Sequence, residues 1–260
     1  MDNSSKKSSV PAKNSNKAIA VCFGISVMVI GLYFIPYGQY VLYPFMLIYT
    51  FIHEMGHGIM AELVGGDFVK FEMWVDGSGV ASNATPVDMS RIKLALIAFG
   101  GLIAPAVIAA ISLVLGRSGR ASRIGMALFG LICVLSLIFV VRNLFGFFFV
   151  LGCGIVSFLL AFVPKSPRVP QYSMLVLAIT LLTAVFSRGD YLFTDTAQTA
   201  AGVMPSDVGQ IARNLFLPYW FWGGLIALIS VLILILGIRG FFIGLGKEPV
   251  NEQKKITSDE

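Results

Sequence analysis

Residues 40–64 read YVLYPFMLIYTFIHEMGHGIMAELV, a mostly apolar run that is long enough to cross a lipid bilayer. A transmembrane helix needs about 20 predominantly apolar residues. Inside this run lies the pentapeptide His53-Glu54-Met55-Gly56-His57, which holds both histidines of the chain. Ionisable side chains are expensive to place in hydrocarbon. A polar cluster within a predicted membrane helix is therefore a candidate functional site.

The rest of the chain has the same apolar character. Of its 260 residues, 57% are hydrophobic and only 13% are charged, and the mean hydropathy is +0.83. Soluble globular domains carry about 25% charged residues. The deficit of charge extends along the whole chain, which predicts a multi-pass membrane protein. The net charge of +5 is modest and forms no basic stripe, which argues against a nucleic-acid partner.

Further apolar runs on either side of residues 40–64 are candidate membrane-spanning helices. The polar residues 1–17 and 247–260 are expected to be disordered tails that flank a membrane domain at residues 18–240. The first run is too long for a signal peptide and lacks a small-residue cleavage site, so we expect it to be retained. The simplest location is the cell (inner) membrane. The runs are Ala18–Ile35, Tyr40–Val64, Ile92–Leu115, Ile124–Val141, Leu144–Val163, Tyr172–Phe186 and Tyr219–Ile238.

A small β-hairpin is predicted between the second and third runs. Phe68–Val75 alternates apolar and polar residues for most of its length, and Asp76-Gly77-Ser78-Gly79 is a turn sequence. Val80–Ala84 can then return as the second strand. The predicted fold class is therefore an all-α polytopic membrane protein with about six to seven transmembrane helices and this one hairpin.

The spacing within the pentapeptide is typical of a zinc site on a helix. Residues i and i+4 lie on the same helix face about one turn apart, so His53 and His57 can both direct an imidazole nitrogen at one ion. Glu54 is then placed to take a proton from a zinc-bound water, which completes the HExxH pattern of two ligands and a general base. Alternatively, these residues only pair with other polar groups inside the membrane. That alternative does not explain why they stand at ligand spacing.

A catalytic zinc ion usually has three protein ligands, so the chain must supply one more. It has no third histidine, and its three cysteines lie in apolar segments, where free cysteine usually behaves as a small buried hydrophobe. We therefore expect a carboxylate, and the best candidates are Asp190 and Asp207 in the polar connection Ser187–Pro218. Each has another interpretation: Asp190 can pair with the arginine near it, and Ser206-Asp207 can cap the short helix that follows.

A series of short motifs runs along residues 40–235: His53-Glu54-x-x-His57, Val64-Gly65-Gly66, Asp76-Gly77-Ser78-Gly79-Val80, Ala98-Phe99-Gly100-Gly101-Leu102, Arg142-Asn143 and Ser206-Asp207. In this order they resemble the site-2 proteases, a group of intramembrane zinc metallopeptidases. The closest resemblance is to their compact bacterial and plant branch, the peptidase M50B-like proteins.

This resemblance implies that His53 and His57 bind Zn²⁺, that Glu54 is the catalytic base, and that an aspartate is the third ligand. In typical site-2 proteases the aspartate lies in an L-D-G segment. The comparable stretch here is Leu151-Gly152-Cys153, with glycine in the aspartate position. The resemblance thus implies that Asp190 or Asp207 replaces the usual ligand.

These observations predict an intramembrane zinc metallopeptidase that hydrolyses peptide bonds in or near the bilayer. Its partner would be a transmembrane or membrane-adjacent protein substrate, which the predicted hairpin could hold in an extended form by β-augmentation. Asn143 is a candidate substrate-binding residue and Arg142 a candidate for stabilising the oxyanion, although both also suit a polar turn between helices. The hairpin has an alternative role as an anchor at the membrane interface, through Phe71, Met73 and Trp74.

Two other functions are compatible with the sequence. The glycine at position 152 motivates a catalytically inactive membrane scaffold or regulator that keeps the fold. The intramembrane cluster His53, Glu54 and His57 also suits a transporter that relays protons or metal ions.

Overall fold

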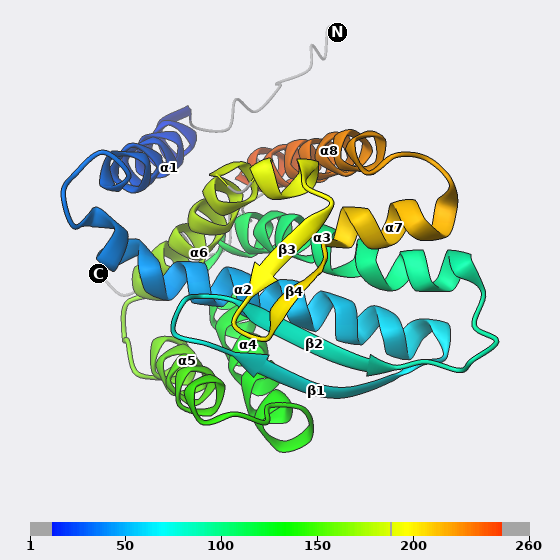
Figure 1. Cartoon of the computed structure of the whole chain (residues 1–260). Helices are drawn as coiled ribbons and strands as arrows, with labels where there is room; N and C mark the ends of the chain where they lie inside the picture. The colour runs from blue at the N-terminus through cyan, green and yellow to red at the C-terminus, as the bar shows by residue number, and fades with distance from the viewer. Residues whose placement is uncertain (1–11, 188, 246–260) are drawn as a thin grey trace, which may run out of the picture.

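The structure is a computed structural model that describes residues 12–187 and 189–245. This part of the chain is predominantly helical and contains two short antiparallel hairpins (Figure 1). The elements are α1 Ala12–Leu32, α2 Gly38–Val64, β1 Asp67–Met73, β2 Gly79–Ala84, α3 Arg91–Leu115, α4 Gly119–Phe139, α5 Leu144–Phe162, α6 Arg168–Ser187, the 3₁₀ helix η1 Gly189–Phe193, β3 Thr196–Thr199, β4 Gly202–Pro205, α7 Asp207–Leu215 and α8 Tyr219–Leu245.

Among the described residues, five helical segments are long and apolar enough to cross a membrane. They are α3, α4, α5, the segment Arg168–Phe193 that contains α6, and α8. α1 contributes a shorter apolar segment, Ala20–Leu32, and α2, which carries the pentapeptide, is not one of the five. The predicted class, an all-α polytopic membrane protein with a small hairpin after the HExxH helix, is confirmed. The predictions for the two polar tails fall mostly on residues 1–11 and 246–260, which lie outside the described part of the chain.

The outward faces of the spanning helices are apolar. Leu144 on α5 and Leu236 on α8 are 78% and 64% exposed, and α4 exposes a row of large aliphatic side chains as well. Soluble proteins rarely leave contiguous apolar surface of this extent in water. In a bilayer the same side chains contact lipid tails, so the helix lengths and the surface both indicate a multi-pass membrane protein.

α2 and α3 approach each other closely at two glycines. A methyl group at Gly56 would lie 2.5 Å from the carbonyl oxygen of Gly100, and one at Gly100 would lie 2.7 Å from that of Gly56. Small residues at such positions allow membrane helices to come into backbone contact. The contact brings α3 against the part of α2 that bears the pentapeptide.

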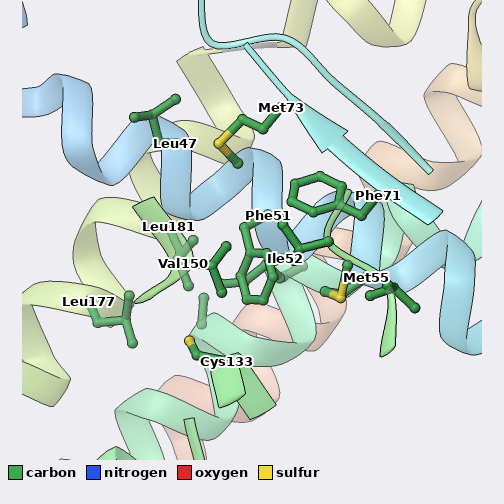
Figure 2. Packing of buried hydrophobic residues seen from close by; sticks show 14 of the residues in the cluster. Leu47, Phe51, Ile52, Met55, Phe71, Met73, Cys133, Val150, Leu177 and Leu181 are labelled. Atoms are coloured by element: carbon green, nitrogen blue, oxygen red, sulfur yellow. The ribbon is translucent and has the colours of Figure 1, made fainter. Parts of the chain in front are cut away.

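The β1–β2 hairpin lies along α2, and one of its strands is part of the protein core. The side chains of Phe71 and Met73 on β1 are fully buried, and the Phe71 ring makes an edge contact with Phe51 of α2 at 5.7 Å between ring centroids (Figure 2). A methyl group at Gly79 of β2 would lie 2.6 Å from the Thr50 side chain of α2, so the strand can come this close only with glycine there. The alternative of an anchor at the membrane interface through Phe71, Met73 and Trp74 does not hold for Phe71 and Met73, because both side chains pack inside the molecule, whereas Trp74 is half-buried.

The outer edge of β1 is occupied by the connection between α4 and α5. The Phe71 N–H donates to the carbonyl oxygen of Val140 at 2.7 Å, and the Arg142 N–H donates to the carbonyl oxygen of Phe71 at 3.0 Å. The other edge of β1 pairs with β2. Both edges of β1 are thus used, and the edge of this hairpin that remains available for another strand belongs to β2.

The polar connection before α8 folds into η1, the β3–β4 hairpin and α7. The β3–β4 hairpin was not predicted from the sequence, and Gly202, with φ of 118°, follows its turn. The tip of this hairpin contacts the turn of the first one, where the Ala200 N–H donates to the Ser78 hydroxyl at 3.2 Å. Figure 1 shows β3 and β4 in yellow, crossing in front of α2 toward β2. The two connections, which are far apart in sequence, therefore meet beside α2.

Candidate metal centre

Three buried side chains from two helices converge on one point. The Nε2 atoms of His53 and His57 on α2 are 3.1 Å apart. The Asp207 Oδ2 atom, at the start of α7, lies 3.0 Å from the first and 3.3 Å from the second. All three residues are buried, and within the described residues they form a group of ligand atoms that could hold a metal ion. We call these three side chains the cluster. The i and i+4 spacing therefore places both imidazoles as the sequence predicted, and it is Asp207 that joins them.

The geometry and the chemistry of this group fit a zinc ion. Zinc bonds of about 2.0–2.1 Å in a tetrahedral arrangement separate the ligand atoms by about 3.3 Å. The three separations in the group are 3.0, 3.1 and 3.3 Å. Two imidazoles and one carboxylate also match the usual composition of a catalytic zinc site with three protein ligands. The donor set therefore suits the metal that the pentapeptide predicts.

A backbone carbonyl of α3 orients the imidazole of His57 through the ring nitrogen that faces away from the cluster. The His57 Nδ1 atom lies 2.8 Å from the carbonyl oxygen of Ile97, which can only accept a hydrogen bond, so Nδ1 carries the proton. The lone pair of Nε2 is then directed at His53 and Asp207. Metal-binding histidines are commonly fixed in this way by a carbonyl or a carboxylate on the second nitrogen.

Gly101 on α3 leaves the space that the His57 ring occupies. A methyl group at this position would overlap the imidazole at Nε2, the atom that faces the cluster. We expect Gly101→Ala to displace the ring and to lower zinc affinity by at least about 10-fold, because even residues that only support the metal ligands change metal affinity by about 10–100-fold when they are substituted. Zinc content after dialysis against a competing chelator measures the effect.

Gly152→Ala is the matched control for Gly101→Ala. It makes the same change in another spanning helix, at a position where no described atom lies within 4 Å of the added methyl group. Its zinc content should equal that of the unmodified protein. Equal zinc content in both variants would show that Gly101 does not position His57.

Asp207 reaches the cluster because its neighbour caps α7. The Ser206 hydroxyl accepts a hydrogen bond from the Gly209 N–H at 3.0 Å, which is the N-cap role predicted for this pair. The Asp207 carboxylate is therefore not needed as the cap, and it is turned toward α2. Burial alone would raise the pKa of this carboxyl, but His57 and His53 beside it hold the pKa below its usual range. A carboxyl group binds zinc in its deprotonated form, which is the form that this lowered pKa favours.

Glu54 lies beside the cluster and is held by the first hairpin. Its Oε2 atom accepts a hydrogen bond from the Ala81 N–H of β2 at 2.7 Å, and the side chain is buried. The Ala81 N–H therefore points away from β1. Alternate residues of a strand point their backbone groups in the same direction, so Gly79 and Asn83 also face the side of the cluster.

Two cavities meet at this point. A larger one, of about 490 Å³, runs between Thr50 of α2, the turn at Gly77 and strand β3. A smaller one, of about 100 Å³, contains the cluster itself and also includes Ala81 and Gln210. His53 and Glu54 line both cavities. The cluster therefore lies next to a larger cavity whose walls include residues of both hairpins and of α2.

Arg142 and Asn143 lie in the connection between α4 and α5, and their side chains bind backbone groups there and in β1. The Asn143 side chain clamps the end of β1: its Oδ1 atom accepts from the Met73 N–H at 3.2 Å and its Nδ2 donates to the Met73 carbonyl. The Arg142 guanidinium donates to the carbonyl oxygens of Val141 and Phe139. Neither residue is among the described residues that line the two cavities. Their predicted parts in substrate binding and oxyanion stabilisation gain no support, and the contacts match the alternative of a polar turn.

Two other positions were considered for the third ligand: Asp190, and position 152, where typical site-2 proteases have an aspartate. Asp190 belongs to η1, but its side chain is outside the described part of the structure, so its candidacy stays a prediction. Position 152 on α5 has no described atom within 4 Å of where a side chain would begin. The cluster is therefore assembled from α2 and α7, without a contribution from that position.

Sequence reasoning missed Tyr191 of η1. Its hydroxyl donates a hydrogen bond to the Asp207 Oδ2 atom at 3.2 Å, and its ring contacts that of His53 edge-on at 6.2 Å between centroids. The sequence offered little to find it by, because a single tyrosine next to a candidate aspartate is not a motif. Only the packing of η1 against α2 and α7 brings it to the cluster.

Comparison with protein families matches residues 22–237 to the family described as Peptidase M50B-like. Comparison with curated proteins and with solved structures finds no match. The matched region covers most of the chain and includes α2, both hairpins and α7, and therefore the whole cluster. With its apolar spanning helices and a buried group of two histidines and an aspartate, the chain belongs to the Peptidase M50B-like family of membrane metallopeptidases.

Proposed function

We propose that this protein is an intramembrane zinc metalloendopeptidase that hydrolyses peptide bonds in or near the bilayer. One observation carries the proposal: the Glu54 side chain lies beside His53, His57 and Asp207, where two cavities adjoin. A scaffold would need no carboxylate held beside the cluster. The HExxH pattern requires one there as a general base.

In this mechanism His53, His57 and Asp207 hold the zinc ion, which when bound supplies a Lewis acid that acidifies water and polarises a carbonyl group. Glu54 accepts a proton from the attacking water while the new C–O bond forms at the substrate carbonyl carbon. The C–N bond then breaks, and Glu54 returns the proton to the leaving amine. The second proton of the water stays on the new acid, so the products are one carboxylic acid and one amine, and the enzyme ends the cycle in the protonation state in which it began.

The substrate is proposed to bind as an extended strand along β2. A helical segment hides its amides in its own hydrogen bonds, so it must be extended before hydrolysis. The edge of the first hairpin that pairs with no other strand belongs to β2, and it faces the cluster at Ala81, where the N–H donates to Glu54. A strand added there would run past Glu54, which is the arrangement that β-augmentation provides.

The proposed substrate is a transmembrane or membrane-adjacent protein, and the proposed location is the cell (inner) membrane with the lipid bilayer around the spanning helices. The apolar outward faces of α4, α5 and α8 support immersion in lipid. The larger cavity passes between Thr50 and strand β3, so a substrate would reach the cluster along α2. No basic stripe suggests nucleic acid as a further partner.

Removal and return of the metal tests the proposal. Purified protein in proteoliposomes should contain about one zinc ion per chain and should cleave at least one member of a panel of single-span membrane proteins. Treatment with 1,10-phenanthroline should abolish cleavage, because the zinc ion is needed to acidify water, and added zinc should restore it. Cleavage is measured by the appearance of fragments with defined termini in mass spectrometry.

The rival functions give different results in the same preparation. Bound zinc without cleavage of any substrate would contradict the proposal and support a scaffold or regulator. Zinc or proton flux across the vesicles without cleavage would support a transporter. Cleavage that persists without metal would show that the site is not a metallopeptidase centre.

A further inference from the structure

We propose that Tyr191 is a catalytic residue whose hydroxyl stabilises the oxyanion formed at the scissile carbonyl. This inference rests on the proposed function, since it assigns a part in the same hydrolysis. When water adds to a peptide carbonyl, negative charge develops on the carbonyl oxygen. Hydrogen-bond donors held at that position are among the strongest contributors to such reactions.

The oxyanion needs a hydrogen-bond donor that lies beside the cluster. The two that the sequence offered, Arg142 and Asn143, are committed to backbone groups away from the cavities. The Glu54 carboxylate is an acceptor. The backbone N–H of Ala81 already donates to Glu54. The amide side chains of Asn83 and Gln210 line the smaller cavity only, whereas the Tyr191 hydroxyl belongs to a residue that lines both.

Tyr191 is placed where this donor is needed. It lines both cavities, as His53 and Glu54 do, so it stands at the point where a substrate entering through the larger one meets the cluster. Its hydroxyl lies 3.2 Å from the Asp207 Oδ2 atom, within one hydrogen bond of the proposed zinc ligands. Thr199 also lines both cavities, but its hydroxyl donates to the Gly202 carbonyl within the β3–β4 turn.

The ring of Tyr191 is held while its hydroxyl can turn. The ring contacts His53 edge-on and packs against the hydrophobic core that contains Val208 and Ile211 of α7. The hydroxyl hydrogen of a tyrosine is a rotor, so the same group that donates to Asp207 can donate to a substrate oxygen instead. Such a donor is fixed in place before the reaction and needs little rearrangement during it.

The step balances without any further reactant. Glu54 takes the proton of the attacking water, and the electron pair of the carbonyl π bond moves to the carbonyl oxygen. Tyr191 donates a hydrogen bond to this oxygen but keeps its proton. When the C–N bond breaks, the electron pair returns to re-form the carbonyl, the proton on Glu54 passes to the amine, and the Tyr191 hydroxyl can return to Asp207.

Tyr191→Phe tests the assignment, because it removes only the hydroxyl and leaves the ring against His53. We expect kcat to fall about 100-fold, as for the loss of one oxyanion donor, with KM changed by less than about threefold. Affinity for a phosphinic peptide, which mimics the tetrahedral intermediate, should fall by the same factor as kcat/KM, whereas affinity for an uncleaved ground-state peptide should not change. All measurements are made at saturating zinc, with zinc content determined for each variant.

Tyr172→Phe is the matched control. Tyr172 on α6 is 46% exposed and is not one of the described residues lining the two cavities, so its hydroxyl should not affect kcat. Unchanged kcat in Tyr191→Phe at saturating zinc would overturn the assignment. If a parallel series at limiting zinc then showed a loss of activity, Tyr191 would only position Asp207. An unmodified protein that binds zinc and cleaves nothing would refute the proposed function itself. An active protein with an equally active Tyr191→Phe would refute the assignment alone.

Discussion

Glu54→Gln should lower the rate of peptide hydrolysis by about 10²–10⁴-fold while the protein keeps its zinc and its fold. Glutamine cannot accept a proton from water, but its amide oxygen can still accept the hydrogen bond from the Ala81 N–H that now binds Oε2. The substitution therefore removes the base without freeing β2 from α2. Single-turnover cleavage of the substrate found with the unmodified protein, together with zinc content and melting temperature, measures the effect.

Glu62→Gln is the control on the same helix. Glu62 is exposed near the end of α2, where its Oε1 atom accepts from the Phe68 N–H at 2.7 Å, a contact that glutamine can also make. The Glu62→Gln variant should cleave the substrate at the rate of the unmodified protein. If Glu54→Gln were as active as Glu62→Gln, Glu54 would not be the base and the proposed mechanism would fail.

The second large effect is expected at Asp207. Asp207→Asn should lower zinc affinity by more than about 100-fold, which exceeds the 10–100-fold typical of residues that only support ligands. The amide replaces an anionic donor that lies 3.0 Å from His53 Nε2 and 3.3 Å from His57 Nε2, and neutral amide oxygen is a poor zinc ligand. Competition with a chromogenic chelator measures the affinity, and cleavage should be lost in parallel.

Two other aspartates of the same connection serve as comparisons. Asp195→Asn should keep zinc, because Asp195 is exposed and pairs with Arg213 at 3.1 Å, away from the cluster. Asp190→Asn should also keep zinc if Asp207 is the third ligand. Loss of zinc in Asp190→Asn with retention in Asp207→Asn would reverse the assignment.

Much of the architecture could be predicted because it depends on local features of the chain. Five of the seven apolar runs correspond to described helices that are long and apolar enough to span a membrane, since burial in lipid requires length and low polarity in one continuous segment. The alternation in Phe68–Val75 and the turn after it predicted the first hairpin, which the structure contains as β1 and β2. The cap at Ser206 could be recognised in the same way, because its hydroxyl binds a backbone N–H only three residues away.

Other predictions failed or stayed open because they depend on contacts between distant segments. Asn143 was expected near a substrate, but its amide binds Met73, 70 residues earlier in the chain. The sequence also allowed Phe71 and Met73 to lie at the membrane interface, but both side chains pack in the protein core with residues of α2. Side-chain type and local spacing cannot distinguish these outcomes, because both partners of each contact are needed to decide it.

The amino-acid sequence by itself determined that this is a membrane protein and that His53, Glu54 and His57 form one polar site, since helical spacing brings i and i+4 together wherever the helix lies. The tertiary structure alone brought Asp207 to the two histidines and showed which strand edge faces them and that Tyr191 stands beside them. Asp207 lies 150 or more positions from both histidines in sequence, and only the packing of η1 and α7 against α2 and α3 places its carboxylate between their nitrogen atoms.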